Sequence, residues 1–110
     1  MKFGHLHLNF KDLQEAIAWM GKVLEKKPSY SNPNMAVFDV GGASIVFDAS
    51  EVDSTATVAL NSGNCDQDFK RLVSNGGEPI EAPTDLPWGV RAAYIKGPGE
   101  ITVEIEQALE

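Results

Sequence analysis

The side chains that could carry chemistry lie near the two ends of the chain. His5 and His7 alternate with apolar residues near the N-terminus, and Glu104 and Glu106 do the same near the C-terminus. An imidazole beside a carboxylate is the arrangement of a general base and the group that orients it. We therefore take His5 and Glu104 as candidate catalytic residues. The alternative is that both only form hydrogen bonds on a polar face, or that His5 faces solvent.

These candidates belong to segments whose alternating pattern predicts half-buried strands. Each segment has an apolar side that would pack under helices and a mostly polar side. The polar sides would face water in a flat sheet, whereas they would line a polar cup if the sheets curl around each other. In chain order, the polar sides carry His5, His7 and Asn9, then Ser44, Val46 and Asp48, then Thr57, Ala59 and Asn61, then Thr102, Glu104 and Glu106.

The chain presents one series of elements twice. Residues 57–61 align with residues 5–9, and residues 103–106 align with residues 45–48. A helical periodicity follows the first strand of each copy, and Asp12 is the expected N-cap of the first helix. Two copies of one supersecondary unit usually pair across a pseudo-two-fold axis.

Turn signals predict the remaining elements. Gly41-Gly42 is a strong signal for a two-residue hairpin, and Gly97-Pro98-Gly99 marks a second hairpin near the C-terminus. The helices are expected over residues 13–24 and 64–74, further strands over residues 29–31, 35–40, 78–82 and 89–96, and a loop over residues 83–87.

Composition and charge exclude several classes of function. The formal net charge of −7 and the sparse basic residues disfavour a nucleic-acid partner, which would need a basic face. No stretch approaches the roughly 20 apolar residues of a membrane span, so we expect no membrane partner and a cytoplasmic location. The single cysteine, Cys65, excludes an intramolecular disulfide and is expected to be an incidental small residue.

Two sets of motifs resemble the vicinal oxygen chelate superfamily, which includes glyoxalase I, extradiol dioxygenases and the fosfomycin- and bleomycin-resistance proteins. The opening motif is His5-x-x-Leu8-x-Phe10-x-Asp12-Leu13, followed by a helix that ends in Lys22-Val23-Leu24. The closing motifs are Trp88-Gly89-x-Arg91, Gly97-Pro98-Gly99-Glu100 and Val103-Glu104-Ile105. The resemblance implies an α+β fold of two βαβββ modules, with mixed sheets curled into a cup and helices outside. It implies one domain over residues 1–110, with modules at about residues 1–50 and 56–110.

The resemblance also implies where a metal would bind in the metal-dependent members. His5 matches the first ligand position and Glu104 the last, but Val46 and Thr57 stand at the two positions between them. Valine cannot ligate, and a threonine hydroxyl is a poor ligand for a divalent transition metal. We therefore expect a degenerate metal site and no cofactor, with a divalent metal as the alternative. The resemblance further implies a homodimer.

Several other residues are candidates for ligand binding. Trp88, which lies in a loop beside a glycine, is the best candidate for stacking on a planar ligand. Arg91 is a candidate clamp for a carboxylate or phosphate, with a surface salt bridge as the alternative. The complete set of candidate ligand-binding residues is Phe38, Val46, Thr57, Trp88, Arg91 and Tyr94.

The expected function is to bind a small organic molecule in a polar and aromatic cleft without an essential metal. The first alternative is a divalent-metal-dependent lyase, isomerase or dioxygenase of the same superfamily, in which Asp48 would supply a shifted third ligand beside His5 and Glu104. The second alternative is a structural or regulatory dimer whose cleft has lost its function.

Overall fold

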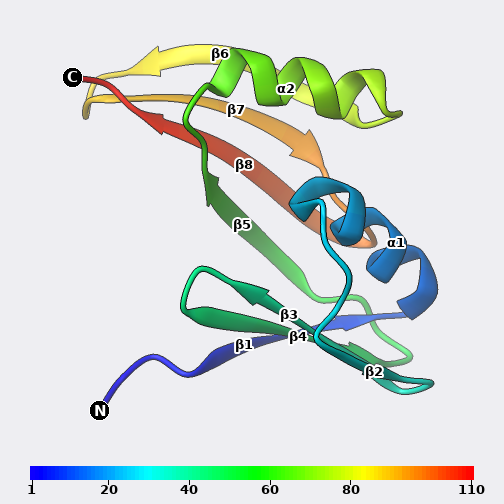
Figure 1. Cartoon of the computed structure of the whole chain (residues 1–110). Coiled ribbons are helices and arrows are strands. Elements are labelled where there is room, and N and C mark those ends of the chain that lie inside the picture. Colours follow the sequence, from blue (N-terminus) through cyan, green and yellow to red (C-terminus); the bar gives the residue numbers. More distant parts are fainter. The chain divides into compact units, whose positions relative to one another are not determined.

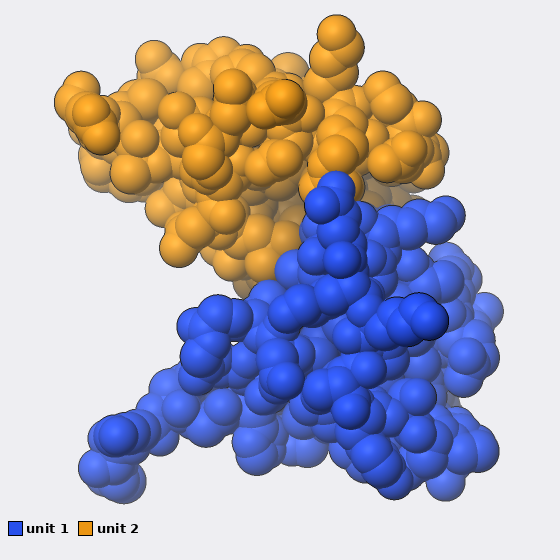
Figure 2. All heavy atoms as spheres, in the orientation of Figure 1, with its two compact units in different colours: residues 1–54 blue, residues 55–110 orange.

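The computed structural model describes all residues, 1–110, and divides into two compact units (Figures 1 and 2). Unit 1 is Met1–Ser54 and unit 2 is Thr55–Glu110. Each unit contains a strand, a helix and three further strands, which form an open four-stranded mixed sheet. This arrangement confirms the predicted α+β class and the repeated βαβββ pattern.

Unit 1 pairs its first strand with its last. Its sheet has the order β1-β4-β3-β2, in which β1 and β4 are parallel and the other neighbours are antiparallel. Gly41 and Gly42, between β3 and β4, have φ angles of 58° and 91°, as the predicted tight hairpin requires. The elements are β1 (His5–Phe10), α1 (Leu13–Leu24), β2 (Tyr30–Asn32), β3 (Met35–Val40) and β4 (Ala43–Ala49).

Unit 2 repeats this topology with longer strands. Its sheet has the order β5-β8-β7-β6, and β5 is parallel to β8 as β1 is to β4. The elements are β5 (Thr55–Asn61), α2 (Cys65–Ser74), β6 (Glu78–Leu86), β7 (Val90–Lys96) and β8 (Glu100–Ala108).

The outer strand of unit 2 corrects one expectation. The loop expected over residues 83–87 is wrong for most of its length, because β6 continues to Leu86. A proline is tolerated here because β6 is an edge strand, where a missing N–H interrupts no second ladder. The pairing with β7 shifts register twice, between Pro79 and Glu81 and between Glu81 and Thr84, so the strand stays paired but irregular.

The core of unit 1 lies between α1 and one face of its sheet. The N-cap prediction is confirmed, because the Asp12 side chain accepts a hydrogen bond from the Glu15 backbone N–H at 3.0 Å. Phe47 is fully buried, with its ring 4.8 Å from that of Phe10 and 5.4 Å from that of Phe38. Leu6, expected on the apolar side, is instead 41% exposed.

The core of unit 2 follows the same plan. The Asn64 side chain caps α2 by accepting from the Gln67 backbone N–H at 3.0 Å. The buried apolar side chains of this core come from α2 and from one face of three strands: Val58, Cys65, Leu72, Ala93, Ile95, Ile101, Val103 and Ile105. Ala92 is also buried, on the opposite face of β7. Neither helix of the chain is long and apolar enough to cross a membrane.

Candidate functional site

The open face of each sheet, meaning the face opposite its buried core, carries most of the residues singled out in the sequence. Core and open-face residues alternate along each strand, because successive side chains of a strand point to opposite sides. On the open face of unit 1, β1 contributes His5, His7 and Asn9, and β4 contributes Ser44, Val46 and Asp48. Most of these side chains are exposed or half-buried, whereas Val46 is only 6% exposed.

The register of the parallel pair β1–β4 sets which of these side chains meet. His5 lies opposite Ser44 and His7 lies opposite Val46. The diagonal partner of each histidine is the β4 residue two positions C-terminal to the residue opposite it. For His5 that residue is Val46, and for His7 it is Asp48. The His7 Nδ1 atom lies 2.7 Å from the Asp48 Oδ2 atom, and the two histidine rings pack edge to face with centroids 4.7 Å apart. The imidazole–carboxylate pair of unit 1 is therefore His7–Asp48.

The open face of unit 2 contains a pair of carboxyl groups. Thr57 of β5 lies opposite Thr102 of β8, so its diagonal partner is Glu104. Thr57 and Glu104 are thus related in unit 2 as His5 and Val46 are in unit 1. Tyr94 of β7 lies directly opposite Glu104. Both Tyr94 and Glu106 influence the pKa of the Glu104 carboxyl group.

Burial and neighbouring charge disfavour ionisation of this cluster. Partial burial, reinforced by the carboxyl group of Glu106, raises the pKa of Glu104. Burial and the charge of Glu104 raise the pKa of Tyr94. Glu104 therefore holds a proton more readily than an isolated glutamate does.

The residues at the four metal-ligand positions do not fit a divalent metal. In unit 1, His5 has valine as its diagonal partner, and in unit 2, Glu104 has threonine as its counterpart on β5. Nowhere in the structure do three or more His, Cys, Asp or Glu side chains gather in a group that could hold a metal ion. A transition-metal site needs at least three protein ligands of this kind, so we derive no chemical step through a metal.

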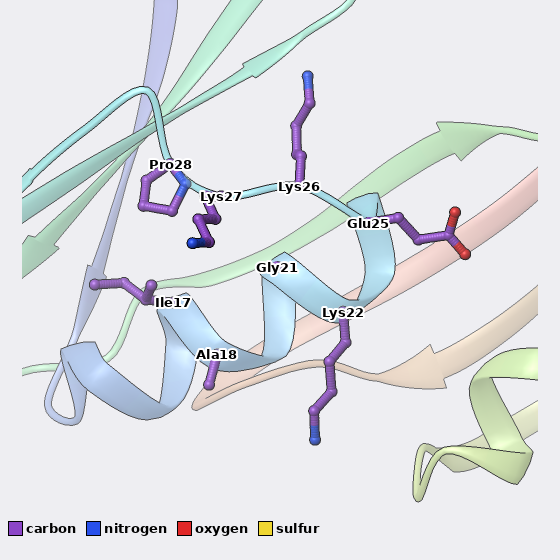
Figure 3. Close-up of a pocket in the computed structure, with 8 residues that line it drawn as sticks. All are labelled: Ile17, Ala18, Gly21, Lys22, Glu25, Lys26, Lys27 and Pro28. Carbon is purple, nitrogen blue, oxygen red and sulfur yellow. The ribbon is translucent and has the colours of Figure 1, made fainter.

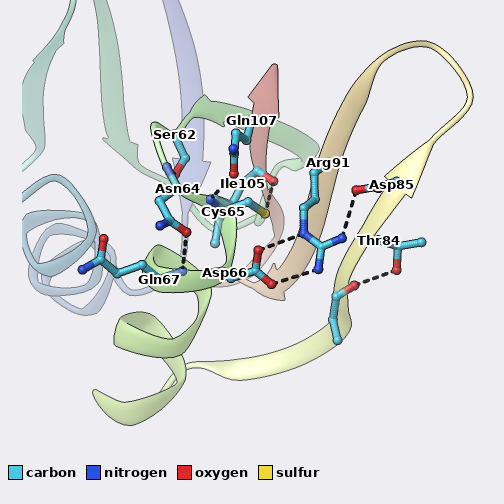
Figure 4. Close-up of polar contacts among 11 residues, drawn as sticks. Ser62, Asn64, Cys65, Asp66, Gln67, Thr84, Asp85, Arg91, Ile105 and Gln107 are labelled. Carbon is cyan, nitrogen blue, oxygen red and sulfur yellow. Dashed lines mark hydrogen bonds and ion pairs between the residues drawn. The ribbon is translucent and has the colours of Figure 1, made fainter. Parts of the chain in front are cut away.

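Arg91 is held by two carboxylates on the core side of β7 (Figure 4). Its Nε and Nη2 atoms donate to the two oxygens of Asp66 at 2.8 and 2.9 Å, and its Nη1 atom donates to Asp85 at 2.9 Å. Asp66 lies in the first turn of α2, Asp85 is the residue before the last of β6, and Arg91 is the second residue of β7, so these contacts tie three elements together. The hydrogen bonds from Arg91 lower the pKa of Asp66, and those carboxylates raise the pKa of Arg91. The salt-bridge alternative is the one observed, and we withdraw Arg91 as an anion clamp.

The aromatic candidates lie in three different environments. Phe38 has no exposed surface and packs on Phe47 in the core of unit 1, so we withdraw it as a ligand contact. Tyr94 is half-buried on the open face of unit 2. Trp88 is 70% exposed in the turn between β6 and β7, where Gly89 adopts a φ of 86°.

Cys65 is a structural residue of α2. Its thiol donates to the Ile105 carbonyl at 3.4 Å, and its backbone N–H donates to the Gln107 side chain at 2.8 Å (Figure 4). Burial, followed by the charge of Asp66, raises the pKa of this thiol. A protonated, fully buried thiol is not a reactive nucleophile.

A groove of about 460 Å³ lies at the C-terminal end of α1, and none of the residues that line it is a predicted site residue (Figure 3). The side chains of Lys22 and Lys26 point in opposite directions from its rim, and the Lys26 Nζ atom donates to the Asp39 carbonyl at 2.7 Å. The basic groups thus do not converge on one point. The groove is lined by Ile17, Ala18, Gly21, Lys22, Glu25, Lys26, Lys27 and Pro28.

Two features of the open faces were not predicted as functional pairs. The alternation had placed His7, Asp48 and Glu106 on the polar sides of their strands, but it could not show which of these side chains bond to each other. That information lies in the register of strands that are distant in the sequence, because a shift of one residue in register moves every side chain to the other face.

The comparisons with known proteins agree with this architecture. The family model of the Glyoxalase/Bleomycin resistance protein/Dioxygenase superfamily matches residues 2–105. No curated protein matches the chain.

Several solved structures share the fold. A glyoxalase/bleomycin resistance protein/dioxygenase from Nocardioides is 23% identical, with a TM-score of 0.83 over 100% of this chain and 85% of that one. A glyoxalase-related enzyme from Fulvimarina pelagi is 19% identical, with a TM-score of 0.82 over 97% and 88% of the chains. Lactoylglutathione lyase from Agrobacterium tumefaciens is 17% identical, with a TM-score of 0.81 over 96% and 92% of the chains. Because the family model covers nearly the whole sequence, the chain belongs to the Glyoxalase/Bleomycin resistance protein/Dioxygenase superfamily.

Proposed function

We propose that this protein binds a small organic molecule through the polar open faces of its sheets and needs no metal to do so. The observation that carries the proposal is the identity of the β4 residue diagonal to His5 in unit 1. That residue is Val46, whose side chain has no electron pair to offer a metal. The open faces nevertheless keep hydrogen-bonding groups, including His7, Asp48 and Tyr94. A site without metal ligands that retains polar groups is suited to recognition rather than to Lewis-acid chemistry.

The ligand we propose is a planar molecule with at least one hydroxyl group. Exposed Trp88 supplies a stacking surface, and Thr57 and Glu104 supply hydrogen-bonding groups. Glu104 is half-buried on this face and lies directly opposite Tyr94, so its carboxyl group is placed to form a hydrogen bond with a ligand hydroxyl group. We also propose that the protein acts as a cytoplasmic homodimer, which sedimentation of the untagged chain would test.

The first experiment is elemental analysis of the untagged protein, purified without chelators, before and after addition of nickel, zinc, manganese and ferrous iron. We expect no ion above background. One ion per chain, lost in His5→Ala or Glu104→Gln, would overturn the proposal in favour of a metal-dependent lyase, isomerase or dioxygenase. One solved neighbour, the lactoylglutathione lyase, carries a name of that kind.

The second experiment is a ligand screen with small aromatic and anionic compounds, followed by tryptophan fluorescence. The chain has two tryptophans, so the screen uses Trp19→Phe, in which all tryptophan emission comes from Trp88. We expect at least one hydroxylated aromatic compound to change this emission in a saturable way. No saturable change across the screen would favour the structural or regulatory dimer instead.

A further inference from the structure

We propose that His7 and Asp48 form a general-base pair on the open face of unit 1, in which Asp48 is the positioning residue and the His7 Nε2 atom takes a proton from a ligand hydroxyl group. The pair is distinct from His5 and Glu104, the candidates that the sequence suggested. The inference rests on the proposed function only in assuming that ligands reach this face.

The contact between the two residues fixes the tautomer of His7. An ionised carboxylate accepts hydrogen bonds and cannot donate them, so the atom 2.7 Å from Asp48 Oδ2, which is His7 Nδ1, carries the proton. In the neutral ring the lone pair is then on Nε2. A carboxylate that holds a histidine in this way also stabilises the imidazolium that forms when Nε2 takes up a proton.

The position of the pair on the sheet makes it available to a ligand. The His7 side chain is 55% exposed and that of Asp48 is 34% exposed, so the ring is held from one side and open on the other. The other ionisable groups on this face are His5, which packs against His7, Asp39 of β3, which accepts a hydrogen bond from Ser44 at 3.1 Å, and Tyr30 of β2, whose hydroxyl group accepts one from Asn32 at 3.2 Å. None of them contacts Asp48 in place of His7.

The topology explains why the pair lies here. His7 and Asp48 have the same diagonal relationship across β1 and β4 as His5 and Val46, one step further along both strands. Since side chains two residues apart on a strand point to the same face, the step keeps the pair on the open face. His7 and Asp48 are therefore placed relative to each other as His5 would be to a polar side chain at position 46.

The step that the pair would catalyse transfers one proton. The O–H bond of the ligand breaks and leaves its electron pair on the oxygen, while a new N–H bond forms at Nε2. The positive charge of the imidazolium faces the negative charge of Asp48, and the ligand remains as an oxyanion. The substrate class is therefore a small molecule with an ionisable hydroxyl group, such as a phenol or an enol.

Hydrolysis of 4-nitrophenyl acetate tests for a free Nε2 lone pair. The lone pair attacks the acetyl carbon and 4-nitrophenolate leaves with the electrons of the ester bond. Water then releases acetate and a proton and restores the imidazole. The chain has only two histidines, so His5→Ala and His7→Ala divide all imidazole reactivity between them. This assay needs no natural ligand. A negative ligand screen would therefore count against the proposed function, whereas a His7→Ala variant with the native hydrolysis rate would count against the general base.

We expect His7→Ala to lower the protein-dependent rate about tenfold, a modest value for an exposed base, and His5→Ala to retain most of it. Asp48→Asn should also lower the rate, because an amide can donate to Nδ1 and move the ring proton to Nε2. Asp39→Asn is the matched control, which removes one negative charge from the same open face. Circular dichroism confirms that each variant is folded.

Nitrogen-15 spectra of the two histidines provide a readout that a merely structural role would not move. We expect a proton on Nδ1 of His7 in the native protein and its redistribution to Nε2 in Asp48→Asn. A His7→Ala variant with the native rate overturns the proposal, as does a native spectrum with the proton of His7 on Nε2. Loss of the rate in His5→Ala alone would transfer the role to His5 and overturn it too.

Discussion

Glu104 and Glu106 lie two residues apart on the open face of β8, where the carboxyl group of Glu106 disfavours ionisation of Glu104. Partial burial, reinforced by Glu106, raises the pKa of Glu104 above its ordinary value of 4.5. A carboxyl group whose pKa is raised by folding stabilises the native state while it is protonated. That contribution is lost as the pH rises from the ordinary value through the raised one.

Glu104→Gln is therefore expected to increase the melting temperature at pH 7, because a neutral amide removes a partly buried negative charge from beside Glu106. The advantage over the native protein should shrink as the pH is lowered toward 4, where Glu104 itself is protonated. Thermal unfolding at both pH values measures the effect. Glu100→Gln, at the exposed start of the same strand, is the control, and an equal gain in that variant would contradict the explanation.

The contacts of Arg91 lead to a prediction with the opposite dependence on pH. Arg91→Met should lower the melting temperature at pH 7, because Asp66 and Asp85 lose their partner. The pKa of Asp66 is lowered by folding, so its stabilising contribution is present at neutral pH and lost as the pH falls through the lowered value. The deficit of the variant should shrink in acid.

Lys70→Met, which removes one positive charge from an exposed position of α2, is the control for Arg91→Met. Arg91→Lys should restore only part of the lost melting temperature, because an ammonium cannot form the two parallel hydrogen bonds to Asp66. If Arg91→Lys restored the full melting temperature, the positive charge, rather than the planar geometry of the guanidinium group, would be what holds α2, β6 and β7 together.

Phe47 is the central side chain of the core in unit 1. Phe47→Ala should lower the free energy of unfolding by about 3–5 kcal/mol, because it leaves a cavity between Phe10 and Phe38. Urea denaturation measures this change. Phe3→Ala makes the same substitution at a residue that is 72% exposed and should cost less than about 0.5 kcal/mol. Similar losses in the two variants would contradict the assigned core.

The two N-caps should contribute equally to stability. Asp12→Ala and Asn64→Ala should each lower the free energy of unfolding by about 1 kcal/mol, since each leaves one backbone N–H of the first helical turn without its partner. The control for the first helix is Gln14→Ala, at an exposed position within α1. If it were as destabilising as Asp12→Ala, the cap would not be the cause.

The local pattern of the sequence was enough to predict the elements of the fold. Alternation identified the strands, Asp12 identified the start of α1, and Gly41-Gly42 identified a hairpin. An edge strand was expected only over residues 78–82, and residues 83–86 were wrongly expected in a loop that runs from Pro83 to Pro87. A local argument from the prolines does not apply to an edge strand, and the position of β6 at the edge depends on the whole sheet.

The candidate site was less predictable, for a physical reason. The polar sides of the strands were correctly grouped, yet the bonded pair in unit 1 is His7–Asp48. The two partners are far apart in the sequence and meet only through the register of β1 and β4. Arg91 likewise meets Asp66 of a different element, so its choice between a ligand and a salt bridge could not be made from neighbouring residues.

The outer strands of the two sheets have a consequence for behaviour at high concentration. A long, regular edge strand is a template for aggregation, because its unpaired N–H and C=O groups can extend the sheet with another chain. β2 has only three residues, and β6 contains Pro79, Pro83 and two register shifts. The edge at β2 is too short and the edge at β6 too irregular to recruit strands from other molecules, so growth into fibrils by edge pairing is left to the opposite edges, β1 and β5.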